Sequence, residues 1–138
     1  MKSLKEIYNL PYDTSGFNSG LINWYNQVID KSYDDLNVRD VCTIIRQSFL
    51  KDMKDIAIQK AIDFFLKDPY DGEFNDGDLL RVLVSLDIES IDKSNRDKLI
   101  TLLKDTHQNY IKFDWFSEKI KIEYADNIDK MIKKLESI

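Results

Sequence analysis

Apolar side chains recur at helical spacing along most of the chain, and this periodicity limits the folds that it can adopt. Residues 21–28 show the pattern, in which positions i, i+3, i+4 and i+7 form one buried face of a helix: Leu21, Trp24, Tyr25 and Val28. The chain has only four glycines and two prolines, and its β-branched residues do not alternate with polar ones as they do in strands. The sequence therefore predicts an all-α fold, a compact bundle of about six to eight helices with little or no sheet.

Capping residues and helix breakers place the ends of these helices. Ser3 is the expected N-cap of the first helix, with Glu6 at the capping-box position. Pro69 ends a helix because proline excludes the residue before it from the α region, and Asp76 is the expected N-cap of the next helix. The expected helices span residues 4–9, 20–30, 37–49, 56–66, 79–86, 92–110 and 122–138, with a single turn over 33–36. The alternating residues in 111–122 leave a two-stranded piece open there.

A chain of 138 residues is long enough for one hydrophobic core, and no linker divides it, so a single domain over 1–138 is expected. In the helix after Asn37, a buried stripe is expected that leaves Asp40 on the outside; its members are Val38, Val41, Cys42, Ile45 and Phe49. Cys42 is the only cysteine, which excludes an internal disulfide and suits a core position. The N-terminus has no apolar signal core and no apolar window approaches membrane-spanning length, so a cytoplasmic protein is expected.

Residues suited to catalysis or metal binding are scarce. His107 is the only histidine and is expected to be partly exposed at the surface. The sequence has no nucleophile elbow, phosphate-binding loop or dinucleotide motif, and one cysteine with one histidine cannot form the usual zinc site. No register of the acidic residues in 68–78 meets the EF-hand pattern for calcium. The sequence therefore predicts no enzyme activity, no metal, no cofactor and no small-molecule ligand.

The acidic residues are unevenly distributed along the chain. Residues 63–78 contain six carboxylates and one lysine, so this window has a net charge of −5, equal to the formal net charge of the whole protein. Such an electronegative patch repels nucleic acid and attracts a basic partner. The charge run can also be a solvated surface that serves only solubility. The sequence thus excludes nucleic acid as a partner and indicates a basic protein.

Two aromatic residues, Tyr70 and Phe74, lie among these acids. In a protein interface, aromatic side chains supply burial while carboxylates supply orientation and fast encounter. The alternative is that both rings fold back onto the core beneath the loop. The partner-binding residues inferred from charge are Asp68, Tyr70, Asp71, Glu73, Phe74, Asp76 and Asp78.

Three blocks of sequence, in order and at plausible spacing, resemble the immunity proteins of bacterial contact-dependent growth inhibition (CDI) systems. The first is Trp-Tyr-Asn-Gln-Val-Ile-Asp-Lys at residues 24–31, and the second runs from Leu36 to Gln47 and includes Ile45-Arg46. The third includes Ala61-Ile62, Asp68-Pro69, Gly72-Glu73 and Gly77-Asp78-Leu79-Leu80. Together these blocks cover about half of the chain, residues 21–86, and the part after Leu86 carries no matching motif.

The resemblance implies a non-enzymatic inhibitor that binds the C-terminal toxin domain delivered by a neighbouring cell. Many such toxins are nucleases such as RNases, whose basic grooves the acidic window would complement. If the window is not the contact surface, the C-terminal third is, with Trp115, Phe116 and Tyr124 as candidates. Two other classes stay open from the residues alone: a helical adaptor that binds a basic cellular partner, and a small hydrolase that uses Glu73.

Overall fold

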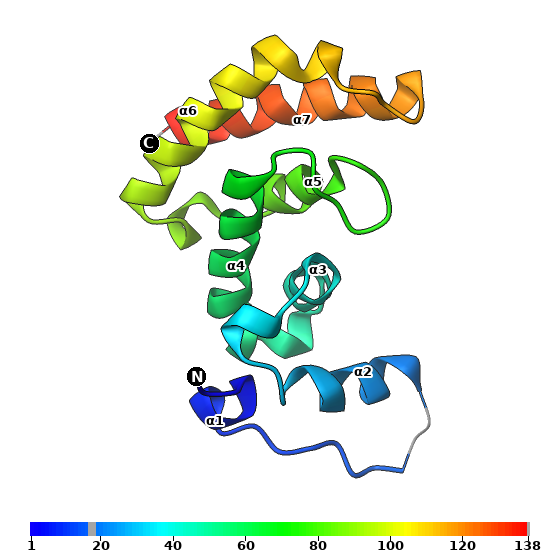
Figure 1. The fold of residues 1–138 in the computed structure, drawn as a ribbon. Helices are drawn as coiled ribbons and strands as arrows, with labels where there is room; N and C mark the ends of the chain where they lie inside the picture. Colours follow the sequence, from blue (N-terminus) through cyan, green and yellow to red (C-terminus); the bar gives the residue numbers. More distant parts are fainter. Residues whose placement is uncertain (17–18, 138) are drawn as a thin grey trace. The chain divides into compact units, whose positions relative to one another are not determined.

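The computed structural model describes residues 1–16 and 19–137, which form seven α-helices, four short 3₁₀ helices and no strand (Figure 1). The α-helices are α1 (Leu4–Tyr8), α2 (Gly20–Val28), α3 (Val38–Arg46), α4 (Lys54–Lys67), α5 (Asp78–Val84), α6 (Lys93–Asn109) and α7 (Glu118–Glu136). The 3₁₀ helices are η1 (Tyr33–Asp35), η2 (Ser48–Met53), η3 (Ile88–Ser90) and η4 (Tyr110–Lys112). The prediction of an all-α fold with six to eight helices is confirmed.

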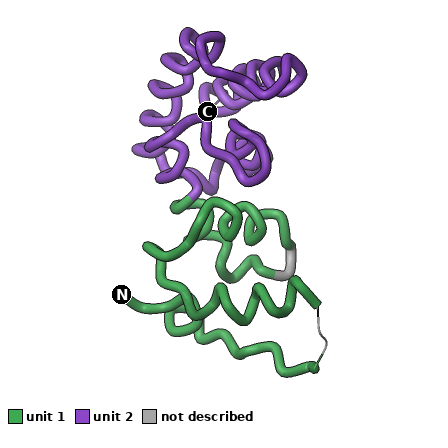
Figure 2. The backbone as a smooth tube through the Cα atoms, turned by 45° about the vertical axis from the view of Figure 1, so that its right-hand side comes forward, with its two compact units in different colours: residues 1–60 green, residues 61–138 purple. Residues whose placement is uncertain are grey.

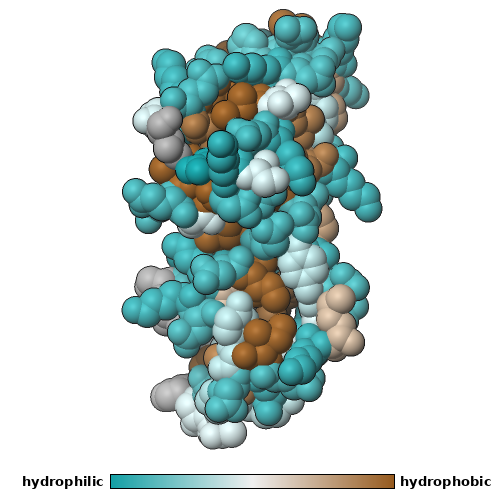
Figure 3. Space-filling view, turned by 90° about the vertical axis from the view of Figure 1, so that its left-hand side faces the viewer, coloured by the Kyte–Doolittle hydropathy of each residue, from teal (hydrophilic) through white to brown (hydrophobic). Residues whose placement is uncertain are grey.

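The chain divides into two compact units, coloured separately in Figure 2: unit 1 is Met1–Lys60 and unit 2 is Ala61–Ile138. The boundary falls within α4. The single domain expected over 1–138 therefore stays a prediction. On the face drawn in Figure 3, hydrophilic side chains cover most of the surface. None of the described helices has the length and apolar character needed to cross a membrane.

The helices of unit 1 begin at capping residues. Ser3 and Glu6 form the predicted capping box of α1, and Asn37 and Asp40 form a second box at the start of α3. The core of unit 1 consists of Leu4, Val28, Ile29, Leu36, Val41, Cys42, Ile44, Ile45, Leu50, Met53, Ala57 and Ile58. Cys42 is thus a core residue, as predicted. The side chain of Phe49, also predicted in this core, lies outside the described residues.

The buried face predicted for α2 is only partly found. Val28 is buried, whereas Leu21 is exposed and Trp24 and Tyr25 are half-buried. The two rings stay near the surface because each carries a polar atom that needs a partner. The Trp24 indole donates to Asp40 (2.9 Å), and the Tyr25 hydroxyl donates to a backbone carbonyl of the preceding loop (3.0 Å).

Asp40 was predicted on the outside of its helix, and this prediction is wrong: only 3% of its surface is exposed. Its carboxylate lies 2.7 Å from Lys31 Nζ and accepts hydrogen bonds from the Trp24 indole (2.9 Å) and the Asn37 amide (3.2 Å). A carboxylate can be buried where a cation and hydrogen-bond donors satisfy it. The helical pattern could not reveal this, because Lys31 and Trp24 come from other parts of the chain.

Unit 2 consists of the C-terminal half of α4 together with α5, α6 and α7. Helix α7 packs against both α5 and α6, and it lies alongside α6 in Figure 1. Asp92 caps α6 and Ser117 caps α7, while α4 ends two residues before Pro69, as predicted. The core of unit 2 consists of Ala61, Ile62, Phe65, Leu79, Leu80, Val82, Leu83, Leu86, Ile91, Leu99, Leu103, Tyr124, Ile128, Met131 and Leu135.

No strand forms over residues 111–122, where the alternating pattern left one open. The 3₁₀ helix η4 occupies the start of this stretch, and Ser117 is the N-cap of α7, which begins at Glu118. The alternation has another cause: Phe113 and Trp115 pack inward in half-buried positions, while Asp114 between them is exposed. The sequence of this turn therefore alternates as a strand does, because two of its rings pack inward and the residue between them faces solvent.

Candidate functional site

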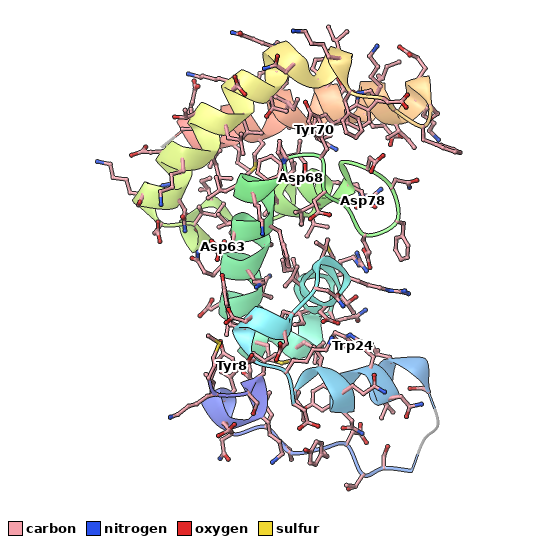
Figure 4. The ribbon with its side chains drawn as sticks, in the orientation of Figure 1. Tyr8, Trp24, Asp63, Asp68, Tyr70 and Asp78 are labelled. Carbon is pink, nitrogen blue, oxygen red and sulfur yellow. The ribbon has the colours of Figure 1, made fainter. Side chains whose placement is uncertain are left out.

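The acidic window extends from α4 into the loop that joins α4 to α5 (Figure 4). Asp63 lies on α4, and the other five carboxylates lie in residues 68–78, which we name the acidic loop. Two of these five residues, Asp68 and Asp76, are exposed. The other three are half-buried: Asp71, Glu73 and Asp78. The loop therefore does not present all of its charge to solvent.

The side chain of Asp78 accepts hydrogen bonds from the backbone of the acidic loop to which it belongs. Its Oδ1 accepts a hydrogen bond from the Glu73 amide (2.5 Å). Its Oδ2 accepts from the amides of Phe74 (3.1 Å) and Asn75 (3.0 Å). Consecutive amides that converge on one carboxylate stabilise its charge without a cation. Asp78 is thus a structural residue that shapes the loop.

Further hydrogen bonds close the loop at its base. The Gly77 amide donates to the Tyr70 carbonyl (2.6 Å), and the Leu79 amide donates to the Asp71 carbonyl (3.3 Å). At the start of the loop, Asp68 Oδ1 accepts from the Tyr70 amide (3.0 Å), as aspartate side chains commonly do in turns. The two ends of the loop consequently lie side by side, and the exposed carboxylates are attached to a hydrogen-bonded backbone.

Gly77, rather than the predicted Asp76, is the N-cap residue of α5. Its φ of 80° lies in the left-handed region that favours glycine. A Cβ at this position would lie 2.6 Å from the ring of Tyr124 and 3.1 Å from the ring of Trp115. The sequence pattern pointed to Asp76 because aspartate is a common cap, but the close approach of two rings from the C-terminal segment requires glycine one residue later.

An aromatic cluster supports the acidic loop. The Tyr70 ring stacks on Phe113, with centroids 4.2 Å apart, and its centroid lies 5.7 Å from those of Trp115 and Tyr124. The Tyr124 hydroxyl donates to the Pro69 carbonyl (2.6 Å). Burial raises the pKa of Tyr124 far above its ordinary value, so this hydroxyl keeps the proton that it donates. Tyr70 therefore folds back into the unit.

The residues predicted from charge to bind a partner lie together in the acidic loop but fall into two groups. One group consists of the exposed residues Asp68, Phe74 (66% exposed) and Asp76, together with the half-buried Glu73. The other group shapes the loop: Tyr70, Asp71 and Asp78. Phe74 and Tyr70 thus take opposite orientations, one outward and one inward.

Asp71 shows the electrostatic effect of this crowding. Its pKa is raised above the ordinary value, chiefly because burial disfavours the charged form. The Gly72 amide, which donates to Asp71 Oδ1 (2.8 Å), opposes this change, while the nearby charges of Asp68, Asp78 and Asp76 raise the pKa further. The neighbouring carboxylates therefore add to the effect of burial and disfavour the ionised form of Asp71.

The supporting residues of the C-terminal segment were only partly recognised from the sequence. Trp115 and Tyr124 were considered as contact residues, but Tyr124 is only 2% exposed and Trp115 is half-buried, with its indole donating to the Tyr110 carbonyl (2.7 Å). Phe113 was not recognised as a support for the loop. The available signal was the aromatic-rich stretch 113–116, which shows the composition but not the partner ring, Tyr70.

The single histidine and the potential metal-binding side chains form no site at the acidic loop in the described part of the chain. His107 lies on α6 at the surface, as predicted, with its Nε2 3.5 Å from Asp129 Oδ1 of α7. In the described part of the chain, no group of three or more potential metal-binding side chains lies together. The chemical features of the acidic loop are therefore charge and aromatic surface.

The sequence matches a family model described as CDI immunity proteins over residues 6–100, more than half of the chain. No curated protein sequence matches it significantly. The matched region contains the whole acidic loop, whereas residues 101–138, which include Phe113, Trp115 and Tyr124, lie beyond it. The chain therefore belongs to the family of CDI immunity proteins, which are non-enzymatic inhibitors of cognate CDI toxins.

Proposed function

We propose that this protein binds and neutralises the C-terminal toxin domain of a CDI effector in the cytoplasm of the producing cell, and that this toxin is a nuclease. Membership of the family indicates that the partner is a CDI toxin, and the charge distribution indicates that the binding surface of this toxin is basic. The whole excess of negative charge lies in residues 63–78. A groove that binds nucleic acid presents positive charge to phosphates, so an acidic loop complements it.

The solvent-facing side of the acidic loop makes the contact in this proposal. Asp68, Glu73 and Asp76 take the place of phosphates, because a carboxylate can receive the paired hydrogen bonds of an arginine as a phosphate does. Phe74, which is 66% exposed, supplies apolar burial beside them.

The inward-facing residues contribute by ordering the loop before the toxin arrives. The three amide hydrogen bonds to Asp78 and the stacking of Tyr70 on Phe113 support this role. A loop that is already ordered loses less conformational entropy on binding, which leaves more of the contact energy as affinity. The proposal requires no metal, cofactor, nucleic acid or membrane.

The concentration of charge in one loop of an immunity-family member carries this proposal, and capture of the toxin tests it. A tagged form of the protein, expressed in the cells that encode it, is expected to retain the C-terminal domain of a large secreted effector. That domain is then incubated with RNA and with DNA, with and without the protein. Degradation that the protein prevents supports the proposal. A captured toxin that degrades neither substrate contradicts the nuclease assignment, and stoichiometric capture of housekeeping proteins alone favours the adaptor alternative.

A variant without the outer charges tests the contact surface. Asp68→Asn, Glu73→Gln and Asp76→Asn together keep the side-chain shapes, and an asparagine oxygen at residue 68 can still accept the Tyr70 amide. Since steering by opposite charges accelerates association, we expect association with the captured toxin domain to slow by about tenfold at low salt. The dependence of the association rate on salt should become shallower.

The matched control removes the same number of charges from exposed positions outside the acidic loop, with Asp87→Asn, Glu89→Gln and Asp126→Asn. Its association rate should fall much less than that of the loop variant. Equal slowing in both variants would mean that the net charge of the protein, and not the acidic loop, attracts the toxin.

A further inference from the structure

The turn between α6 and α7 presents a large apolar side chain to solvent. Phe116 is 87% exposed, the highest fraction among the large apolar residues of the described chain. Ile111 and Ile122, in the same segment, are 61% and 55% exposed. Several exposed apolar residues in one segment are typical of binding surfaces, where aromatic side chains often dominate the affinity.

The backbone on both sides of Phe116 is held in place. Trp115 donates through its indole to the Tyr110 carbonyl (2.7 Å) and through its amide to the Phe113 carbonyl (3.1 Å). On the other side, Ser117 caps α7 by accepting from the Ile120 amide (3.2 Å). A ring held out on a fixed turn loses little conformational entropy when a partner covers it.

This turn is continuous with the acidic loop. Phe113 stacks on Tyr70 of the loop at 4.2 Å, and the missing side chain of Gly77 leaves room for the ring of Trp115. A shallow depression joins the loop to the first turns of α7, and Asp76 and Glu123 are among its lining residues. Arg81 also lines this depression. The exposed turn and the acidic loop are therefore connected within unit 2 through the rings of Phe113 and Trp115.

We propose that Phe116 is an apolar anchor for the cognate toxin, so that the acidic loop and the α6–α7 turn form a composite binding surface. This inference rests on the proposed function. Charge complementarity identifies the occupant as a basic toxin domain in which an apolar pocket, large enough for a phenyl ring, borders the cationic groove. Phe116 lies in residues 101–138, beyond the part of the chain that the family model matches.

The anchor and the loop act on different rate constants, which makes the inference testable. Phe116→Ala should raise the dissociation rate of the captured toxin domain by about 10- to 100-fold, since hot-spot contacts are lost mainly through faster dissociation. The association rate and its salt dependence should stay close to those of the wild type. Circular dichroism and the melting temperature should be unchanged, because a side chain with 87% exposure adds little to the core.

Ile7→Ala is the control, because Ile7 is also exposed (45%) but lies in α1, outside unit 2. Its dissociation rate should equal that of the wild type. A second variant, Phe116→Lys, places a charge where the proposal puts an apolar pocket and should weaken binding at least as much as Phe116→Ala. If the wild type binds the toxin domain and both Phe116 variants dissociate at the wild-type rate, the anchor is excluded while the proposed function stands. If the wild type captures no toxin domain, the proposed function itself fails.

Discussion

Asp40 in unit 1 is buried and Asp78 in unit 2 is half-buried, and the two carboxylates have different partners. Asp40 lies 2.7 Å from the Lys31 ammonium and accepts from the Trp24 indole. Asp78 accepts hydrogen bonds from three backbone amides of its own loop. One carboxylate is thus paired with a cation, and the other is bound by dipoles.

The difference has a consequence for charge. The charges of Asp40 and Lys31 cancel, so the pair adds no net charge to the molecule. Backbone amides carry no net charge, so Asp78 orders the acidic loop and leaves its negative charge in place. A lysine paired with Asp78 would instead have reduced the charge that we propose attracts the toxin. The partner of a structural carboxylate therefore decides whether the carboxylate contributes to structure alone or to both structure and electrostatics.

The largest effect is expected at Asp40. Asp40→Ala removes the partner of Lys31, whose side chain is 33% exposed, and leaves the Trp24 indole and the Asn37 amide without their acceptor. Because each of these hydrogen bonds ends on a charged, buried carboxylate, we expect their loss together to cost about 3 kcal/mol. Urea denaturation should show this loss in the free energy of unfolding. Asp40→Asn, which keeps one acceptor oxygen, should lose less. Equal stability of Asp40→Ala and the wild type would mean that the pair contributes nothing net.

A smaller and more local effect is expected at Asp78. Asp78→Ala leaves three loop amides without their acceptor, and we expect a loss of about 2 kcal/mol. Hydrogen exchange should accelerate at the amides of Glu73, Phe74 and Asn75, while amides in α6 keep their protection. Asp78→Asn retains one acceptor oxygen, so its exchange rates and its stability should lie between those of the wild type and Asp78→Ala. Unchanged exchange at these three amides would show that the loop is ordered by other contacts.

The smallest effect is expected at Asp71, and it depends on pH. The folded-state pKa of Asp71 is raised, so its ionised form is disfavoured in the fold and costs stability above that pKa. Asp71→Asn should therefore stabilise the protein at neutral pH, by about 0.3 kcal/mol because solvent screens the half-buried group. The gain should disappear as the pH falls below about 3.9, where aspartate is protonated in both states.

Thermal unfolding of Asp71→Asn and the wild type from pH 3 to pH 7 measures this difference. Asp87→Asn, at an exposed position outside the acidic loop, is the control for the loss of one negative charge. A stabilisation of Asp71→Asn that stays constant across the range, or that grows toward acid, would contradict the assigned cause.

Much of the fold could be predicted because it depends on neighbours in sequence. The predicted capping box of Ser3 with Glu6 operates within one helical turn. The end of α4 before Pro69 likewise needs only the residue next to the proline. The outcome differed where distant residues decide it. Asp40, predicted on the outside, is buried by Lys31 and Trp24, and the stretch after η4, where a strand was left open, is a turn packed on Tyr70.

The candidate site was predicted at the level of the loop but not of the side chains. Composition alone located the charge in residues 63–78, and the structure keeps most of it in one loop. The sequence could not say that Tyr70 turns inward while Phe74 turns outward, since both are aromatic residues in an acidic segment. That choice depends on Phe113, which lies more than thirty residues away and stacks on Tyr70.

By itself, the sequence determined the helical class, most helix boundaries, the place of the charge excess and the family, because periodicity, caps, composition and motifs are local properties. The tertiary structure decided which carboxylates are structural and which face solvent. It also decided that Tyr124 is buried and Phe116 exposed, although both are aromatic residues of one short segment. The physical reason is that burial and hydrogen-bond partners depend on which distant surfaces meet, and a linear pattern does not contain that information.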